Sequence, residues 1–401
     1  MIAVRPGLAI LSSLIMRHTA FRTLGLLSIF AHGAFSFKLF DDHSLRSHPH
    51  KHRNANVRAP LGPNTGSSST DHPTWGLTDS FQGEEFTTSS LSRPCVTQHE
   101  DVSSRFYRFP SYYLPECSIG FMHSYIDMQT AIAKNLTRAT RNRLFLHADS
   151  TTVLDPDGPG RDSIRMQSKK QWTAGVTVLN LVHMPEGCGT WPAYWMTQHE
   201  NWPINGEIDI LEGVGFMSTL ILGPNHSALH TLNNCTMAPT RTMTGSVVST
   251  NCSYNYLNNW NQGCPVRWDR KEIYGPSLNA MGGGWFVTER TSSRISIWFW
   301  SRKDKSVPPV VKQGKSPINT KDFGVPFAVW ESSDTCDFNT MFGPENIIIN
   351  LTLCGEWAGQ TPIFNAAGCP GTCVDHVNKN PAAFKDAYWE IASIKVYSKA
   401  L

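Results

Sequence analysis

The stretch Asn205-Gly206-Glu207-Ile208-Asp209-Ile210-Leu211-Glu212-Gly213 decides how this chain folds and where its chemistry lies. Its isoleucines and leucine, bounded by glycines, predict a short strand with one buried face. Because side chains alternate along a strand, Glu207 and Asp209 point the same way. Glu212 would fall on the opposite face, unless one extra residue near Ile210-Leu211 forms a β-bulge. With that bulge, three carboxylates share one face.

Carboxylates crowded on one face repel one another and lose hydration, which raises the pKa of at least one of them. Glycoside hydrolysis uses this asymmetry. Retaining glycosidases place an ionised carboxylate, the nucleophile, about 5 to 5.5 Å from a protonated carboxyl, the acid. Two glutamates near the ends of one bulged strand suit that spacing. The alternative is an acidic strand that simply faces solvent.

Aromatic residues flank this strand and favour the catalytic interpretation. Upstream are Cys188-Gly189-Thr190-Trp191-Pro192-Ala193-Tyr194-Trp195 and then Asn201-Trp202-Pro203. An acidic strand in solvent has no need of such a run, whereas indole faces suit stacking on sugar rings. The 13 Trp in 401 residues point the same way, since Trp combines broad apolar faces with one hydrogen-bond donor.

On these residues the chain resembles glycoside hydrolase family 16, specifically the fungal laminarinase-like branch of endo-β-1,3(4)-glucanases. The resemblance covers roughly residues 120 to 399. Further motifs of that branch occur in order at Asp155-Pro156-Asp157-Gly158-Pro159-Gly160-Arg161-Asp162-Ser163, Ala228-Leu229-His230-Thr231, Tyr274-Gly275 with Gly282-Gly283-Gly284, Cys354-Gly355-Glu356-Trp357-Ala358-Gly359, and Phe384-Lys385-Asp386-Ala387-Tyr388-Trp389-Glu390-Ile391.

The resemblance implies an all-β fold, a concanavalin-like β-jelly-roll sandwich with a substrate cleft on the concave sheet. Short strand-length patterns bounded by Gly, Pro and Asn also indicate a β-sandwich. They lie at 163–167, 175–184, 294–300, 347–353 and 390–397. In 294–300 one face is expected in the core, and the face with Trp298 and Trp300 is expected to form a platform or a second layer.

The resemblance also implies a role for each residue of the motif. Glu207 matches the nucleophile, Asp209 the helper carboxylate beside it, and Glu212 the general acid/base. Asp209 can share a proton with Glu207, so the titration of the two is a joint property. Substrate-binding residues are expected at Trp195, Trp202, His230 and Trp357. For His230 a structural hydrogen bond is the alternative, and Trp191 is expected to pack in the core.

Composition and charge exclude several classes of partner. The net charge of +3 is small and its charges are interspersed, so no nucleic acid or other polyanion is expected. No stretch beyond the N-terminal region could span a bilayer. We expect no cofactor and no metal at the site, a monomer, and a β-glucan polysaccharide as partner.

The first 72 residues are expected to precede the catalytic domain. Residues 1–36 resemble a signal peptide, with arginines before the apolar run 24–31, which is shorter than the roughly 20 residues of a spanning helix. Residues 37–72 are polar and rich in His, Arg and Ser, and are interpreted as a disordered linker or pro-segment. Residues 73–401 form the expected catalytic domain, secreted to the extracellular space or the cell wall.

Cysteines and glycosylation motifs favour export. Ten cysteines without paired zinc spacing indicate disulfides in an oxidising compartment, although their connectivity cannot be deduced from the sequence. N-x-S/T motifs occur at Asn135, Asn225, Asn234, Asn251 and Asn350.

Two departures from the family pattern affect what the resemblance implies. Residues 87–118 are polar where relatives have an aromatic-rich segment, and indicate either a lineage-specific loop or retained intronic sequence. The extra Cys95 could pair with Cys117. Relatives commonly have an aromatic residue where Arg290 follows Glu289, so the sheet behind the cleft is expected to differ there.

The sequence therefore predicts a retaining endo-β-glucanase acting on β-1,3- and mixed β-1,3/1,4-glucans. A transglycosylase of cell-wall glucan is one alternative, because any retaining enzyme can pass its glycosyl intermediate to a sugar. The spacing E-x-D-x-x-E favours hydrolysis, since relatives devoted to transfer tend to have the shorter E-x-D-x-E. A non-catalytic glucan-binding protein is the other alternative, and the presence of all three carboxylates argues against it.

Overall fold

The computed structural model describes residues 73–86, 90–92, 123–155, 158–198, 201–215, 225–232, 234–254 and 261–399. The predicted signal peptide at 1–36, the predicted linker at 37–72, and Cys95 and Cys117 lie outside these residues. Within them, the expected all-β fold is confirmed.

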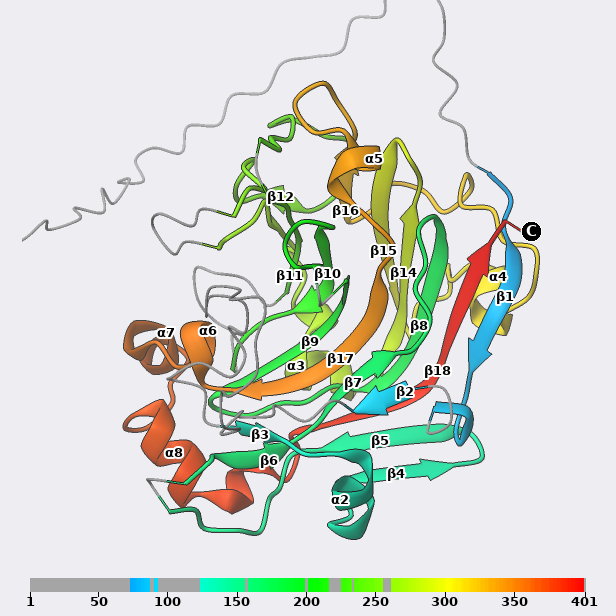
Figure 1. The fold of residues 1–401 in the computed structure, drawn as a ribbon. Coiled ribbons are helices and arrows are strands. Elements are labelled where there is room, and N and C mark those ends of the chain that lie inside the picture. Colours follow the sequence, from blue (N-terminus) through cyan, green and yellow to red (C-terminus); the bar gives the residue numbers. More distant parts are fainter. Residues whose placement is uncertain are drawn as a thin grey trace, which may run out of the picture. The chain divides into compact units, whose positions relative to one another are not determined.

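Most of the described strands belong to two antiparallel eight-stranded sheets (Figure 1). The first runs in the order β16 (Ala328–Glu331), β15 (Arg294–Ser301), β14 (Gly284–Arg290), β8 (Gly175–His183), β18 (Tyr388–Ser398), β5 (Arg143–His147) and β4 (Thr137–Thr140), with β1 (Gly76–Phe81) also paired to β18. The second runs β12 (Ser246–Val247), β13 (Val266–Arg267), β11 (His226–His230), β10 (Glu207–Glu212), β9 (Thr190–Thr197), β17 (Asn346–Leu353), β7 (Arg165–Ser168) and β2 (Ser90–Ser92). A separate parallel pair joins β3 (His123–Tyr125) to β6 (Arg161–Ser163).

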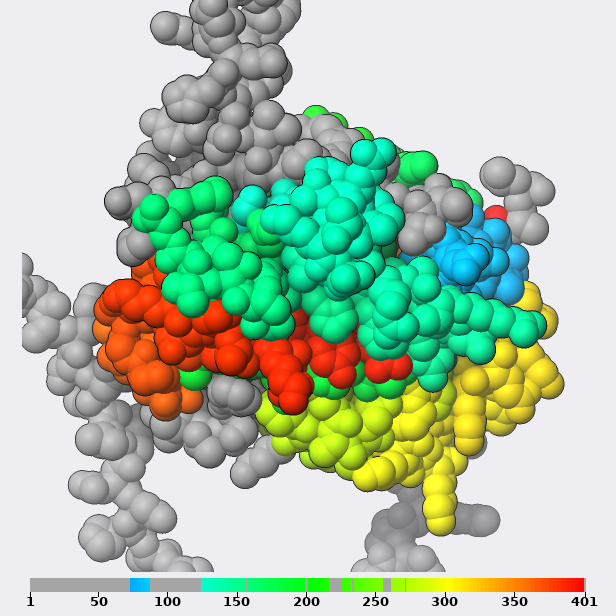
Figure 2. Space-filling view, turned by 90° about the horizontal axis from the view of Figure 1, so that it is seen from below, coloured from blue at the N-terminus to red at the C-terminus, as the bar shows by residue number. Residues whose placement is uncertain are grey.

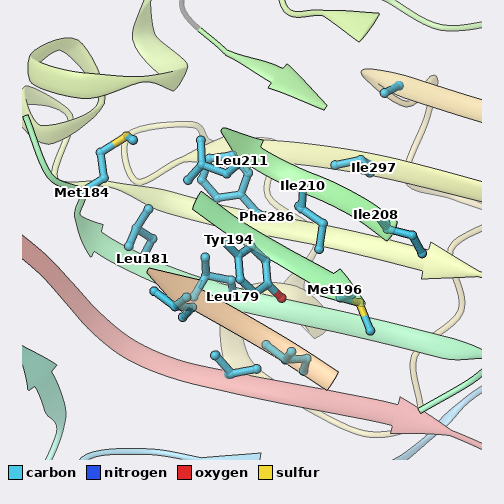
Figure 3. Close-up of a cluster of buried hydrophobic side chains, with 14 of the residues drawn as sticks. Leu179, Leu181, Met184, Tyr194, Met196, Ile208, Ile210, Leu211, Phe286 and Ile297 are labelled. Carbon is cyan, nitrogen blue, oxygen red and sulfur yellow. The ribbon is translucent and has the colours of Figure 1, made fainter. Parts of the chain in front are cut away.

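The main core lies between the two sheets, which is what makes the fold a sandwich. Figure 3 shows Leu179, Leu181 and Phe286 of the first sheet packed against Tyr194 and other side chains of the second. These side chains come from alternate positions of strands rich in Val, Ile and Leu, so each strand contributes one apolar face. This is the predicted jelly-roll sandwich, with β10 inside the second sheet.

The outer face of the first sheet is also covered. Trp298 and Trp300 of β15 pack with Trp75, Ile318 and Phe323 in a second apolar cluster. The tryptophan face of β15 therefore forms a second layer, which is one of the two alternatives expected for it.

Helices in the described residues are short and lie in the connections between strands. They are α2 (Met128–Ala133), η3 (Lys271–Ile273), α3 (Gly275–Ala280), α4 (Pro309–Gln313), α5 (Phe338–Met341), α6 (Gly355–Ala358), α7 (Thr361–Ala366), α8 (Cys373–Lys379) and η4 (Pro381–Phe384). No helix among the described residues is both long and apolar enough to cross a membrane.

Among the described residues, four disulfides join cysteines that are 12 to 181 positions apart. Two of them, Cys188–Cys369 and Cys354–Cys373, hold the segment that contains α6, α7 and α8. The other two, Cys235–Cys336 and Cys252–Cys264, hold the connections around β11 and β13. The expected use of cysteine in disulfides is thus confirmed for these eight residues, and the structure supplies the connectivity.

The C-terminal strand completes the first sheet. β18 pairs with β8, β5 and β1. In Figure 2 the red C-terminal residues accordingly lie against the teal residues of the β4–β5 region. The predicted strand at 390–397 is therefore present, extended to Tyr388–Ser398.

Candidate active site

β10 contains the bulge that the sequence predicts. Against β9, Asp209 pairs with Trp195 and Leu211 pairs with Tyr194, so Ile210 is an extra residue without a partner. The register of β10 against β11 shifts in the same interval. A bulge of this kind inserts one residue and turns the side chains that follow to the other face.

The bulge puts the three carboxylates on one face. Ile210 and Leu211 are adjacent in sequence, yet both are fully buried in the core between the sheets. The alternation therefore restarts at Leu211, and Glu212 returns to the face of Glu207 and Asp209. Figure 3 shows Ile208, Ile210 and Leu211 on the core side of this strand.

Glu207 is held at the start of β10 by the loop before it. The indole Nε1 of Trp202 donates a hydrogen bond to Glu207 Oε2. The hydroxyl of Thr197 donates to the carbonyl of Gly206 at 2.7 Å. Gly206 has φ +75°, and a Cβ there would lie 2.3 Å from the ring of Phe342, so only glycine fits. Trp202, expected to bind substrate, thus also contacts the candidate nucleophile.

Asp209 and His230 form a buried pair beside Glu207. Asp209 Oδ2 lies 3.1 Å from His230 Nε2, and His230 Nδ1 donates to Asn261 Oδ1 at 2.6 Å. Burial raises the pKa of Asp209 well above its usual range, and the charges of Glu207 and Glu212 add to this. Burial lowers the pKa of His230, but Asp209 and Glu207 outweigh it and raise that pKa to about 10. The pair therefore retains a proton at neutral pH.

Glu207, Asp209 and His230 also place potential metal ligands close together. One ligand atom from each lies within 4.8 Å of the others. Two carboxylates and an imidazole are chemically able to bind a cation. A proton shared between Asp209 and His230 accounts for the same close approach without an ion.

Glu212 lies in a different environment from Glu207. The indole Nε1 of Trp191 donates to Glu212 Oε1 at 2.8 Å. Burial raises the pKa of Glu212 to about 7, with a further contribution from the charge of Glu207, while the Trp191 hydrogen bond and His230 oppose the rise. A carboxyl with this pKa is partly protonated at neutral pH, which suits a general acid.

Trp191 packs against the small buried cluster of Val214 and Ala358, as the sequence predicts, but its side chain is only partly buried. Its indole also lies on the carboxylate face and reaches Glu212, a role that was not predicted from the sequence. The alternation of β9 could have revealed this, because Trp191 and Trp195 lie four residues apart in one strand and so share a face.

Trp195 and Trp357 differ in their exposure and in the part of β10 that they lie near. Trp195 is directly across from Asp209, but it is only 7% exposed, because its Nε1 donates to Asn350 at 2.6 Å and the guanidinium of Arg165 lies over its ring. It therefore forms part of the floor. Trp357 is half-buried at the other end, edge-on to Trp191 with ring centroids 5.6 Å apart.

Arg290, the departure from the family pattern, belongs to a buried network behind β10. Its Nη1 donates to Glu345 Oε2 at 2.8 Å and its Nη2 to the carbonyl of Phe342 at 2.7 Å. The adjacent Gly343 donates from its backbone to the carbonyl of Asn205 at 3.0 Å. Arg290 is thus part of an ion pair with Glu345, a residue 55 positions away, which no local sequence pattern could have indicated.

Two of the five predicted glycosylation motifs are inaccessible in the folded chain. Asn225 is 1% exposed and Asn350 is 4% exposed, and the side chains of both make hydrogen bonds within the protein. They are therefore not acceptors in this fold. Asn135, Asn234 and Asn251 are exposed, and their glycosylation stays a prediction.

Comparisons with known proteins show which family model and which relatives this chain matches. A family model described as the XgeA-like, catalytic GH16 domain matches residues 114–397. A probable endo-1,3(4)-beta-glucanase of Aspergillus clavatus is 40% identical over 284 residues, which cover 68% of this chain and 42% of that protein. The chain thus spans less than half the length of that relative.

Two solved structures cover the same region. Laminarinase 16A of Phanerochaete chrysosporium, a GH16 protein with 6-O-glucosyl-laminaritriose in its donor and acceptor sites, is 44% identical with a TM-score of 0.72. An elongating GH family 16 β-1,3-glucosyltransferase is 29% identical with a TM-score of 0.67. In both cases the match covers 81% of this chain and 100% of the other.

Proposed function

This chain belongs to glycoside hydrolase family 16, and we propose that it is a retaining endo-β-glucanase that hydrolyses β-1,3- and mixed β-1,3/1,4-glucans. The observation that carries the proposal is that Glu207 and Glu212, on one bulged strand, have different surroundings. Burial keeps Glu212 partly protonated, with a pKa of about 7, while Glu207 accepts a hydrogen bond from Trp202. Two carboxyl groups held in different surroundings on one face suit the two roles of a retaining glycosidase.

In the first step Glu207 attacks the anomeric carbon as a carboxylate and forms a glycosyl-enzyme. Glu212 protonates the departing glycosidic oxygen in the same step. Trp191 holds the Glu212 carboxyl from the side through its indole N–H, which fixes the direction in which the proton is delivered. The bond between the two sugars breaks, and the sugar on the leaving side departs with the proton.

In the second step Glu212 acts as a base. It takes a proton from water, and the water attacks the same anomeric carbon, so that the β-configuration is retained. Asp209 and His230 keep a proton beside Glu207 through the cycle. This proton can shift toward Glu207 as that carboxylate leaves the sugar, and so stabilises its returning charge.

Substrate binding is assigned to aromatic residues around the carboxylates. Trp202 and Trp357 offer partly exposed rings at the two ends of β10. Trp195 supports the floor between them, and His230 is close enough to Glu207 to contact a sugar hydroxyl there. The β-glucan bound by the Phanerochaete relative supports this class of substrate.

Transglycosylation is the second candidate, because a relative with 29% identity is a β-1,3-glucosyltransferase. The two activities share the first step and differ only in the acceptor that attacks the glycosyl-enzyme. The bulged E-x-D-x-x-E strand of this chain favours water as the acceptor. A non-catalytic glucan-binding role would not require a buried Glu212 whose pKa is raised to about 7.

We also propose that the protein is exported and acts as a monomer on extracellular or cell-wall glucan. Four disulfides support an oxidising compartment.

The experiment that tests the function uses the purified full chain with laminarin, lichenan, cellulose and xylan. We expect shortened products from laminarin and lichenan whose new reducing ends are initially β. Longer products would favour transglycosylation, and initially α products would contradict the retaining mechanism. Binding to laminarin without cleavage of any β-glucan would favour the binding protein.

A further inference from the structure

The bulge in β10 leaves backbone groups that the neighbouring strand cannot satisfy. Between the pairs Asp209–Ala228 and Glu212–His226, two residues of β10 face the single residue Ser227 of β11. A bulge disrupts the ladder in this way, and buried backbone N–H and C=O groups without a partner are costly. The carbonyl of Ile210 and the N–H of Glu212 both need partners from elsewhere.

Two side chains of β11 and its N-terminal neighbour supply those partners. Ser227 Oγ donates to the carbonyl of Ile210 at 2.7 Å. Asn225 Oδ1 accepts from the N–H of Glu212 at 3.0 Å. Both side chains are at most 1% exposed, so water does not compete for these hydrogen bonds. The backbone on both sides of the bulge is therefore tied to one tripeptide.

Trp268 holds this tripeptide in turn. Its indole Nε1 donates to Ser227 Oγ at 2.9 Å, and its backbone N–H donates to the carbonyl of Asn225 at 3.1 Å. Trp268 is fully buried in the core between the sheets. The side chains that hydrogen-bond to the bulge are thus anchored to the buried core of the sandwich.

The middle residue of the tripeptide, His226, lies on the same face as Glu212. His226 pairs with Glu212 across the ladder, and its ring is parallel to that of Trp357 at 5.8 Å. Trp357 meets the edge of Trp191, and Trp191 donates to the Glu212 carboxyl. Asn225 therefore holds the backbone of Glu212, while the ring of His226 belongs to the aromatic group that includes Trp191, the donor to the Glu212 carboxyl.

We propose that Asn225 and Ser227 are positioning residues that lock the bulge and so aim the acid/base Glu212. The proposal rests on the proposed function, in which Glu212 protonates the leaving group. It also gives the motif Asn225-His226-Ser227 a role other than glycosylation, because the asparagine and the serine that define the motif are both used inside the fold. A glycan on Asn225 would remove its side chain from Glu212.

The test uses a reaction in which the need for an acid can be varied. Aryl β-laminarioligosaccharides with phenols from 2,4-dinitrophenol to unsubstituted phenol need increasing protonation as the leaving group becomes less acidic. The ratio kcat/KM reports the first step alone. A residue that only stabilises the fold would lower kcat/KM equally for all phenols, whereas a residue that aims the acid would lower it most for phenol.

For Ser227→Ala we expect kcat/KM to fall roughly 10- to 100-fold on the phenyl substrate and less than about threefold on the dinitrophenyl substrate. Asn225→Ala should show the same dependence on the phenol, and Ser227→Thr, which keeps a hydroxyl, should restore most of the loss. Ser296→Ala is the matched control, because Ser296 is a fully buried serine of β15 whose hydroxyl has no hydrogen-bond partner in the described part of the chain. It should show no dependence on the phenol.

Several outcomes would contradict the proposal that Asn225 and Ser227 position Glu212. Equal losses on all phenols, or none, in both Ser227→Ala and Asn225→Ala would show that the tripeptide does not aim Glu212. An active enzyme from a glycosylating host that carries a glycan on Asn225, found by mass spectrometry of its peptide, would contradict it independently. If the unmodified chain cleaves no β-glucan and no aryl substrate, the proposed function is wrong, and so is the positioning role of Asn225 and Ser227.

Discussion

Replacing Trp191 with Phe should move the pH dependence of the first chemical step to higher pH. The variant keeps an aromatic ring but loses the N–H that donates to Glu212 at 2.8 Å. A hydrogen bond donated to a carboxylate favours its ionised form, so this bond lowers the pKa of Glu212 and its loss raises that pKa. The acid is active only when protonated, and its loss of the proton sets the alkaline limb of kcat/KM.

The size of the shift follows from the strength of that hydrogen bond. A bond to a charged group contributes about 1.5 kcal/mol at the lower end of its range, and about 1.4 kcal/mol corresponds to one pKa unit. Glu212 has a pKa of about 7 in the unmodified chain. We therefore expect the alkaline midpoint of kcat/KM to move from near pH 7 to near pH 8 (roughly one unit).

The assay is kcat/KM on soluble laminarin oligosaccharides from pH 4 to 10, with circular dichroism to confirm folding. Trp298→Phe is the matched control, because the Trp298 indole donates to the carbonyl of Gly324 in the outer cluster of the first sheet. It should leave both limbs of the profile in place. An unchanged or lowered alkaline midpoint in Trp191→Phe would refute the assignment of Glu212 as the acid tuned by Trp191.

The remaining predictions concern binding and stability. Trp357→Ala should weaken binding of laminarin oligosaccharides in calorimetry by about 1 to 3 kcal/mol, the range for bases stacked on aromatic rings, while the protein stays folded. Trp202→Ala should do the same and also lower kcat, because Trp202 donates to Glu207; a large fall in melting temperature with an unchanged KM would place either residue in the core instead. Arg290→Met should lower the free energy of unfolding in urea by about 1 to 3 kcal/mol, since it leaves the fully buried Glu345, whose pKa burial raises to about 8, without its hydrogen-bond donor. The double variant Arg290→Met/Glu345→Leu should recover much of that loss, and a double variant no more stable than Arg290→Met would show that the ion pair is not the cause.

The bulge and the three carboxylates could be predicted because both depend on local alternation. Glu207 and Glu212 are separated by an odd number of positions, so only an inserted residue can bring them to one face. This prediction does not depend on which strands pair with β10. The class of fold was accessible for the same reason, since each strand such as β8 or β17 has its own apolar face.

Other features depend on pairs of residues that are distant in the chain. Nothing near Arg290 indicates Glu345, and nothing near Trp191 indicates that its N–H reaches Glu212. The motif Asn225-His226-Ser227 has the pattern of a glycosylation site, but burial under the bulge decides its role, and burial is a property of the packed sheets. The sequence therefore predicts which groups react, but it does not predict which groups hold them in place.

The central claim is that Glu207 is the nucleophile and Glu212 the acid/base, and azide rescue tests it most directly. An activated aryl β-laminarioligosaccharide with a good leaving group needs little protonation, so Glu212→Ala should still form the glycosyl-enzyme and then stall. Added azide should restore turnover and give the β-glycosyl azide. Glu207→Ala leaves no nucleophile, so azide should enter from the vacated face and give the α-azide by a single inversion. Swapped anomers would reverse the two roles, and the absence of rescue in both variants would contradict the account.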